Sequence, residues 1–135
     1  MKKSILILSI FLAISTVLKS QEKIKSTEVT TETAPVMTFN KTTHDYGTIK
    51  RQSDGKALFL LTNTGKEPLI LSKPRSSCGC TVPEWPQEPI MPGQSDTITL
   101  TYETKKVGNI NKQVTIISNA INSPIVLRIT GKVEE

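Results

Sequence analysis

The sequence predicts an all-β domain, an immunoglobulin-like β-sandwich of about seven antiparallel strands. Several short segments alternate apolar and polar residues with a period of two, which is typical of strands with one buried and one solvated face. Glycine, proline and asparagine separate these segments at near-regular intervals. Beyond the N-terminal region, no segment of useful length has a helical period. The 135 residues, 36% of them hydrophobic, suit one domain with a modest core.

The first 34 residues are predicted to lie outside this domain. Lys2 and Lys3 precede an almost uninterrupted apolar run over residues 5–18, which is short for a membrane span. This order predicts a secretory signal peptide over residues 1–20, with an uncleaved anchor as the alternative. Residues 21–34 predict a flexible linker, because they hold too few large apolar side chains to offset their ordering entropy. The sandwich domain is expected over residues 35–135.

The strands follow one another through this domain. The first two are short, and the third is apolar throughout, as expected of a central strand. The clearest alternation lies in the fifth and the last, where apolar residues recur at every second position. The predicted strands are residues 36–39, 46–49, 57–61, 69–71, 97–102, 114–117 and 125–133. Turn signals lie at residues 63–65, 92–93, 107–109, 118–119 and 122–124.

Charge and composition argue against nucleic-acid binding. The chain has 17 basic and 12 acidic residues, a net charge of +5. Removal of a signal peptide would take Lys2, Lys3 and Lys19 away, leaving 14 basic against 12 acidic residues, or +2. This excess is spread along the chain, aromatic residues are few, and Lys105-Lys106 is interpreted as a solvated turn.

The residue patterns of common enzymes are missing as well. The sequence has one histidine and lacks G-x-S-x-G, paired carboxylates at a telling spacing and a glycine-rich phosphate loop. His44 is interpreted as a hydrogen-bonded surface residue rather than as a ligand or a catalytic base. We therefore predict no catalytic residues and no enzymatic activity.

All thiol chemistry of the chain is confined to Cys78-Gly79-Cys80. In an extended strand residues i and i+2 point to the same face, and the central glycine would let the chain bring the two sulfurs closer. Three hypotheses remain open: a local disulfide, a labile redox pair or reactive dithiol, and a metal site, for which two thiolates suit Cu(I). No cofactor is predicted under the first hypothesis, and copper is the alternative. The candidate third ligands for a metal are His44, Met37 and Met91.

A series of short motifs runs through the domain in one order. They are Asp45-Tyr46-Gly47, Asn63-Thr64-Gly65, Cys78-Gly79-Cys80-Thr81, Met91-Pro92-Gly93, Gly108 and Ser118-Asn119. Over roughly residues 36–133 this order resembles the bacterial family called domain of unknown function 1573 (DUF1573). The resemblance implies an immunoglobulin-like sandwich that is exported in a Gram-negative bacterium, periplasmic or secreted, and akin to chaperone-like and cilia-associated β-sandwich domains. It implies no established activity, and Tyr46 stands where we would expect phenylalanine.

The combined observations predict a non-catalytic module of the cell envelope that binds a protein or peptide partner. Trp85, in a proline-rich loop after the cysteines, is either a cover for the sandwich edge or an exposed anchor for that partner. The alternative function is a thiol-redox or Cu(I)-binding protein that acts through Cys78 and Cys80. No nucleic acid, and no membrane span after signal cleavage, is expected among its partners.

Overall fold

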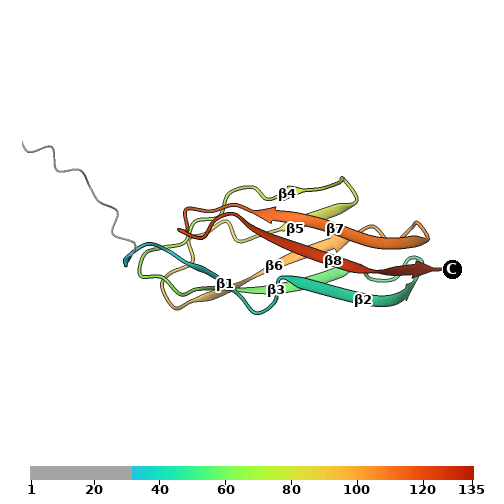
Figure 1. The fold of residues 1–135 in the computed structure, drawn as a ribbon, viewed down its shortest axis with the longest axis horizontal. Coiled ribbons are helices and arrows are strands. Elements are labelled where there is room, and N and C mark those ends of the chain that lie inside the picture. The colour runs from blue at the N-terminus through green and yellow to red at the C-terminus, as the bar shows by residue number, and fades with distance from the viewer. Residues whose placement is uncertain (1–31) are drawn as a thin grey trace, which may run out of the picture.

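The computed structural model describes residues 32–135, which form two four-stranded β-sheets packed face to face (Figure 1). Sheet A has the order β1-β3-β6-β5 and sheet B the order β2-β8-β7-β4. The strands are β1 Met37–Phe39, β2 Thr43–Lys50, β3 Lys56–Asn63, β4 Arg75–Ser76, β5 Thr81–Glu84, β6 Ser95–Tyr102, β7 Gly108–Ile116 and β8 Ile125–Glu134. The described residues contain no helix, and hence none that would cross a membrane.

The predicted all-β sandwich is confirmed, but the expectation of about seven antiparallel strands is wrong in two respects. The described part of the chain has eight strands, and β2 pairs in parallel with β8, with Thr43 opposite Arg128 and Ile49 opposite Val133. The reason is that the chain leaves sheet A after β1 and joins sheet B, so β2 lies beside the last strand instead of forming a hairpin with β1. The signal peptide predicted over residues 1–20, and most of the predicted linker, lie outside the described residues.

Residues 69–71 do not form the predicted strand. Leu69 pairs only with Ile90 of the β5–β6 connection, and Leu71 only with Ser118 of the β7–β8 connection. The segment bridges these two connections once each, so Leu69 is buried without a continuous ladder, whereas Ile70 is 51% exposed. Conversely, β4 and β5 were not predicted, and β5 contains Pro83, which an edge strand tolerates.

The alternation of side chains builds the core between the sheets. The inward positions of β3 and the central inward positions of β6, Ile98 and Leu100, are fully buried, whereas Leu58 and Leu60 point to the outer face of sheet A and are 56% and 44% exposed. The prediction that residues 57–61 form a central strand of a sheet is therefore correct. One face of this strand is exposed to solvent. Core side chains with no exposed surface include Ala57, Phe59, Leu61, Leu69, Ile98, Leu100, Ile116, Leu127, Ile129 and Val133.

A single buried polar side chain joins the connections at one end of the sandwich. Asn63 has no exposed surface, and its Nδ2 donates to the carbonyl oxygens of Glu67 and Ile90 over 2.7 and 2.9 Å. Its Oδ1 accepts from the backbone N–H groups of Gly65 and Val36 over 3.0 and 3.4 Å. One amide thus satisfies backbone groups of the N-terminal entry, the β3–β4 connection and the β5–β6 connection.

The backbone around Asn63 is equally constrained. Its N–H donates to the carbonyl of Gln94 and its carbonyl accepts from Gly93, whose φ of 78° favours glycine. A Cβ atom on Gly65 would lie 2.2 Å from the carbonyl oxygen of Ala34, so only glycine lets the N-terminal entry pack against this turn. The Asn63-Thr64-Gly65 and Met91-Pro92-Gly93 motifs are therefore two parts of one junction.

We predict that Asn63→Asp destabilises the domain by about 2–5 kcal/mol, measured by urea unfolding. The carboxylate has almost the shape of the amide but no N–H, so the carbonyls of Glu67 and Ile90 lose their donor and face a buried oxygen. The matched control is Asn109→Asp, at an exposed position of β7, which should change stability by less than about 0.5 kcal/mol. Equal losses in the two variants would contradict this role for Asn63.

Candidate functional site

The two cysteines lie where the chain passes from one sheet to the other. β4 ends at Ser76 in sheet B and β5 begins at Thr81 in sheet A, so residues 77–80 form the crossover between them. Cys78 and Cys80 are joined in a disulfide with their Cα atoms 5.3 Å apart, a usual separation for such a bond. The pair therefore sits in a turn and not on an extended strand.

Hydrogen bonds outside the disulfide hold this crossover in place. The backbone N–H of Ser77 donates to the carbonyl of Gln113 over 2.9 Å, and the N–H of Gln113 donates to Ser77 Oγ over 3.1 Å. At the other end, the N–H of Glu103 donates to the carbonyl of Cys80 over 2.9 Å. Both ends of the crossover are thus attached to a neighbouring strand or its end, independently of the sulfur–sulfur bond.

The surroundings of the two sulfurs differ. The backbone N–H of Cys80 points at Cys78 Sγ over 3.3 Å, whereas no such donor is found for Cys80 Sγ within residues 32–135. Gly79, between them, has no positive φ, and a Cβ atom there would meet no other atom within 4 Å. The backbone at this position does not require glycine, and a side chain here would enter open space.

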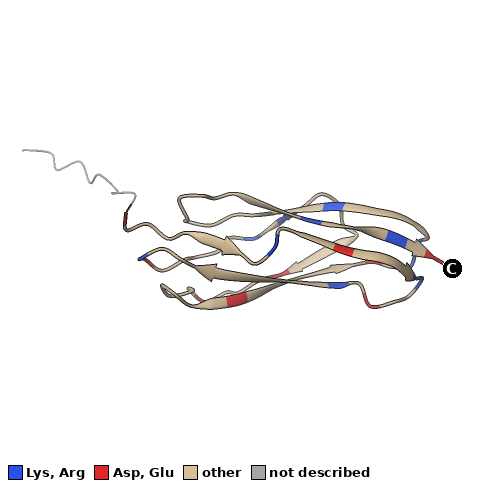
Figure 2. Cartoon of the chain, turned by 60° about the horizontal axis from the view of Figure 1, so that its bottom comes forward, with Lys and Arg blue, Asp and Glu red and all other residues tan. Residues whose placement is uncertain are grey.

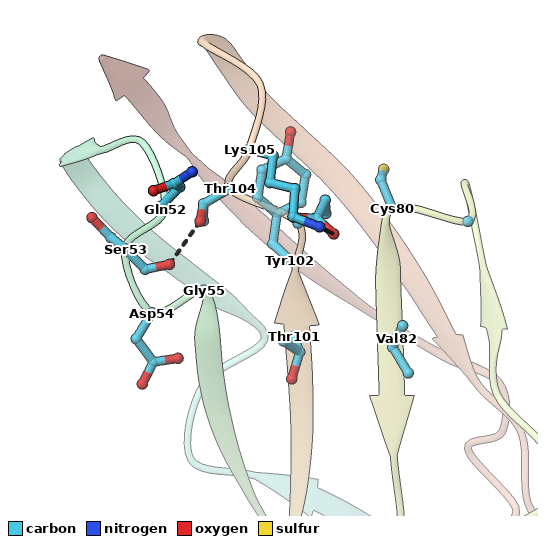
Figure 3. A pocket seen from close by; sticks show the side chains of 12 residues that line it. Gln52, Ser53, Asp54, Gly55, Cys80, Val82, Thr101, Tyr102, Thr104 and Lys105 are labelled. Carbon is cyan, nitrogen blue, oxygen red and sulfur yellow. Dashed lines mark hydrogen bonds and ion pairs between the residues drawn. The ribbon is translucent and has the colours of Figure 1, made fainter. Parts of the chain in front are cut away.

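A pocket of about 430 Å³ adjoins Cys80 at this end of the sandwich (Figure 3). Its walls come from residues 52–55 of the β2–β3 loop, from residues 79–80 and 82, and from residues 101–105 at the end of β6. Cys80 lines this pocket and Cys78 does not. Lys105, predicted to be part of a solvated turn, is one of the lining residues and lies 3.7 Å from the carboxylate of Glu103.

Tyr46 fixes the loop that forms one wall of the pocket. Its hydroxyl donates to the carbonyl of Gly55 over 2.6 Å, and that carbonyl also accepts from the N–H of Tyr102 over 2.9 Å. Burial, together with the nearby Asp54 and Tyr102, raises the pKa of Tyr46 to about 12, so this hydroxyl keeps its proton at neutral pH. A Cβ atom on Gly55 would lie 2.1 Å from the carbonyl oxygen of Tyr102, which explains the glycine.

The proposed third ligands for a metal do not gather around the cysteines. Met37 is buried in β1, and Met91 lies in the β5–β6 connection at the opposite end of the sandwich from the disulfide (Figure 1). His44 lies on β2, where its Nδ1 is 2.9 Å from Lys41 Nζ, and burial and that ammonium lower its pKa. Within residues 32–135 no three His, Cys, Asp or Glu side chains are placed to hold a metal ion. A Cu(I) site on the reduced cysteines stays a prediction.

Trp85, the partner-binding candidate, follows the last residue of β5 and is separated from Cys80 by the whole of that strand. Its side chain is partly buried and packs against the core cluster. Trp85 thus contacts the core and lies apart from the pocket, and its role as an anchor for a partner stays a prediction. The pocket residues Tyr102 and Lys105 had no recognisable signal in the sequence, because three separate connections form the pocket.

The chain belongs to the family described as protein of unknown function (DUF1573), whose model matches residues 37–133. The resemblance found in the motif order is thereby confirmed. A comparison with curated proteins returned no match.

Solved structures share the fold of this chain. A protein of unknown function from Porphyromonas gingivalis matches with a TM-score of 0.64 and 23% identity, over 80% of this chain and 50% of that one. This chain therefore spans about half the length of that relative. The ASH/PapD-like domain 7 of human CEP192 matches with a TM-score of 0.60 and 10% identity, over 76% and 87% of the two chains. The Caenorhabditis elegans MSP family member WR4 matches with a TM-score of 0.56 and 9% identity, over 71% and 97%.

We predict that replacing both cysteines by serine leaves the domain folded. A bridge between residues two apart closes so small a loop that the chain-entropy model assigns it only about 1.6 kcal/mol, roughly half the value for a 15-residue loop. Urea unfolding of the Cys78→Ser/Cys80→Ser variant should show a loss of about that size, with the circular dichroism of the native protein retained. Failure to fold, or a loss above about 4 kcal/mol, would mark the disulfide as a structural staple instead.

Proposed function

We propose that this chain is a non-catalytic, exported module of the cell envelope that binds a protein partner through the outer face of sheet A. The observation that carries the proposal is the exposure of Leu58 and Leu60, 56% and 44%, on a strand with neighbours on both sides. A solvated sheet face usually presents polar side chains at such positions. Adjacent exposed apolar residues on a rigid sheet are typical of interaction sites.

The two leucines lie in a strip of apolar and hydroxyl side chains, which the exposed Lys56 and Glu84 border. In the register of sheet A, Leu58 lies opposite Thr99 and Leu60 opposite Thr97 of β6. Beyond them, Val82 of β5 lies opposite Thr101 and is 57% exposed. We call this set of residues, Leu58, Leu60, Val82, Thr97, Thr99 and Thr101, the Leu–Thr face. The side chain of a threonine offers both a methyl and a hydroxyl group, so the face suits an apolar partner surface with a few hydrogen-bonding groups.

Sheet B presents a different outer face. Arg128 and Lys132 point outward from β8, and Asp45 is exposed on β2. Figure 2 shows the charged residues distributed singly along strands and loops, without a basic stripe that would suit nucleic acid. The apolar patch thus belongs to sheet A, and burial of its leucines by a partner would remove exposed apolar surface from water.

The edge strands of both sheets are poorly suited to pairing with a strand of a partner. They therefore favour binding through the face of a sheet. β1 has three residues and β4 two, which leaves little ladder to extend. β5 carries Pro83, and the ladder of β2 is interrupted between Asp45 and Thr48, where Gly47 has a φ of 62°. Short strands, proline and bulges are the devices that keep an edge from pairing with another chain.

We predict that Leu58→Thr/Leu60→Thr abolishes recovery of the partner in crosslinking pull-downs from envelope extracts, and that it leaves stability within about 0.5 kcal/mol of the wild type because both side chains are exposed. The matched control is Val126→Thr, which removes a 45% exposed apolar side chain from sheet B and should preserve recovery.

Two results would contradict the proposal. One is equal recovery of the same partner by wild type and by the double-leucine variant. The other is a concentration-dependent dimer of the purified wild type, measured by light scattering, that the double-leucine variant lacks, because the occupant of the Leu–Thr face would then be a second copy of this chain.

A further inference from the structure

We propose that Cys78–Cys80 is a thiol–disulfide exchange site that accepts electrons from a dithiol of another protein or peptide, with Cys80 receiving the incoming thiolate and Cys78 leaving. The inference does not rest on the proposed function, because it concerns the sulfur atoms and not the two leucines, although the pocket at Cys80 shares Val82 and Thr101 with the Leu–Thr face. It rests on three features of the crossover: an open approach to one sulfur, a hydrogen-bond donor at the other, and a backbone held from outside the bond.

The approach to the disulfide is open on the side of Cys80. An attacking thiolate must arrive in line with the bond, on the side of the attacked sulfur away from the leaving sulfur. Cys80 lines the 430 Å³ pocket and Cys78 does not, so a thiolate that enters the pocket meets Cys80 first. Gly79, between the two cysteines, adds no side chain, and a Cβ atom there would meet no atom outside residues 78–80 within 4 Å.

The leaving sulfur already has a hydrogen-bond donor in place. As the bond breaks, negative charge develops on Cys78 Sγ, toward which the backbone N–H of Cys80 points over 3.3 Å. A preorganised N–H is more valuable to this thiolate than to the neutral disulfide, so it favours departure of Cys78 over departure of Cys80.

The exchange balances in two steps. A thiolate of the partner attacks Cys80 Sγ, forms a mixed disulfide with it and releases Cys78 as a thiolate. The second thiol of the partner, as its thiolate, then attacks the partner's own sulfur in the mixed disulfide and releases Cys80. The partner dithiol loses two electrons and two protons and becomes a disulfide, and Cys78 and Cys80 gain them and become thiols.

The crossover can pass through this cycle without unfolding. The bonds between Ser77 and Gln113 and between the carbonyl of Cys80 and Glu103 involve neither sulfur, so reduction removes none of their donors or acceptors. The oxidised and reduced forms are therefore expected to share the same fold, which a reversible electron acceptor needs.

The first test locates the mixed disulfide. The purified protein is mixed with reduced glutathione as the probe, quenched in acid within the first turnover, alkylated with iodoacetamide and mapped by mass spectrometry. We expect glutathione on Cys80 and alkylation on Cys78. This product should exceed the reverse one, with glutathione on Cys78, by about fivefold or more, which is the effect of one hydrogen bond. Glutathione on Cys78 or equally on both sulfurs, or a disulfide that resists millimolar glutathione altogether, would overturn the proposal.

The second test uses the empty space above Gly79. Gly79→Ala and Gly79→Val should both fold, because the backbone at this position suits any residue and a Cβ atom there meets nothing. Reduction by glutathione should become slower from Gly to Ala to Val as the side chain covers the bond, while urea unfolding stays within about 0.5 kcal/mol of the wild type. Equal reduction rates in the wild type and the two variants would show that the attacking thiolate does not pass residue 79. That result would refute the proposed exchange site.

Discussion

The fold depends on one buried amide at the end of the sandwich where the chain enters. Asn63 is the last residue of β3, and its side chain and backbone bind groups from the N-terminal entry and from the β3–β4 and β5–β6 connections. Connections of this kind must satisfy their backbone groups somewhere once they are removed from water. Because a single asparagine with two donors and an acceptor does so for several of them, the irregular end of the domain has one arrangement in which all its polar groups are paired.

The opposite end of the sandwich, which holds the disulfide, is held together by several separate contacts. This difference affects the reactivity that the disulfide can have. Tyr46 anchors the β2–β3 loop at Gly55, and the crossover is bonded at Ser77 and Cys80 to strands on both sheets. The disulfide is an addition to a turn that other bonds already position. A bond that contributes little to stability is free to serve as a reactive group, and the adjoining pocket gives a reactant room to approach it.

Much of the fold was predictable from local patterns, and the failures have physical causes. Alternation located β6 and β8, a continuous apolar run located β3, and turn residues located their ends, because all of these signals depend on neighbouring residues. Residues 69–71 have the composition of a strand but pair once each with the β5–β6 and β7–β8 connections, and the two residues of β4 are too few to show a period. For the site, the sequence located the sulfurs but not the pocket, whose residues come from three connections far apart in the chain.

By itself, the sequence determined which side chains lie on opposite faces of each strand, where the chain turns, and that all thiol chemistry is confined to one tripeptide. Only the tertiary structure decided that β2 joins β8 in parallel, that Leu58 and Leu60 face outward without a cover, and that the pocket opens at Cys80. The physical reason is that alternation reports the two faces of a strand but not its neighbours. Strand pairing is made by backbone groups that are the same in every residue, so long-range packing selects the partner.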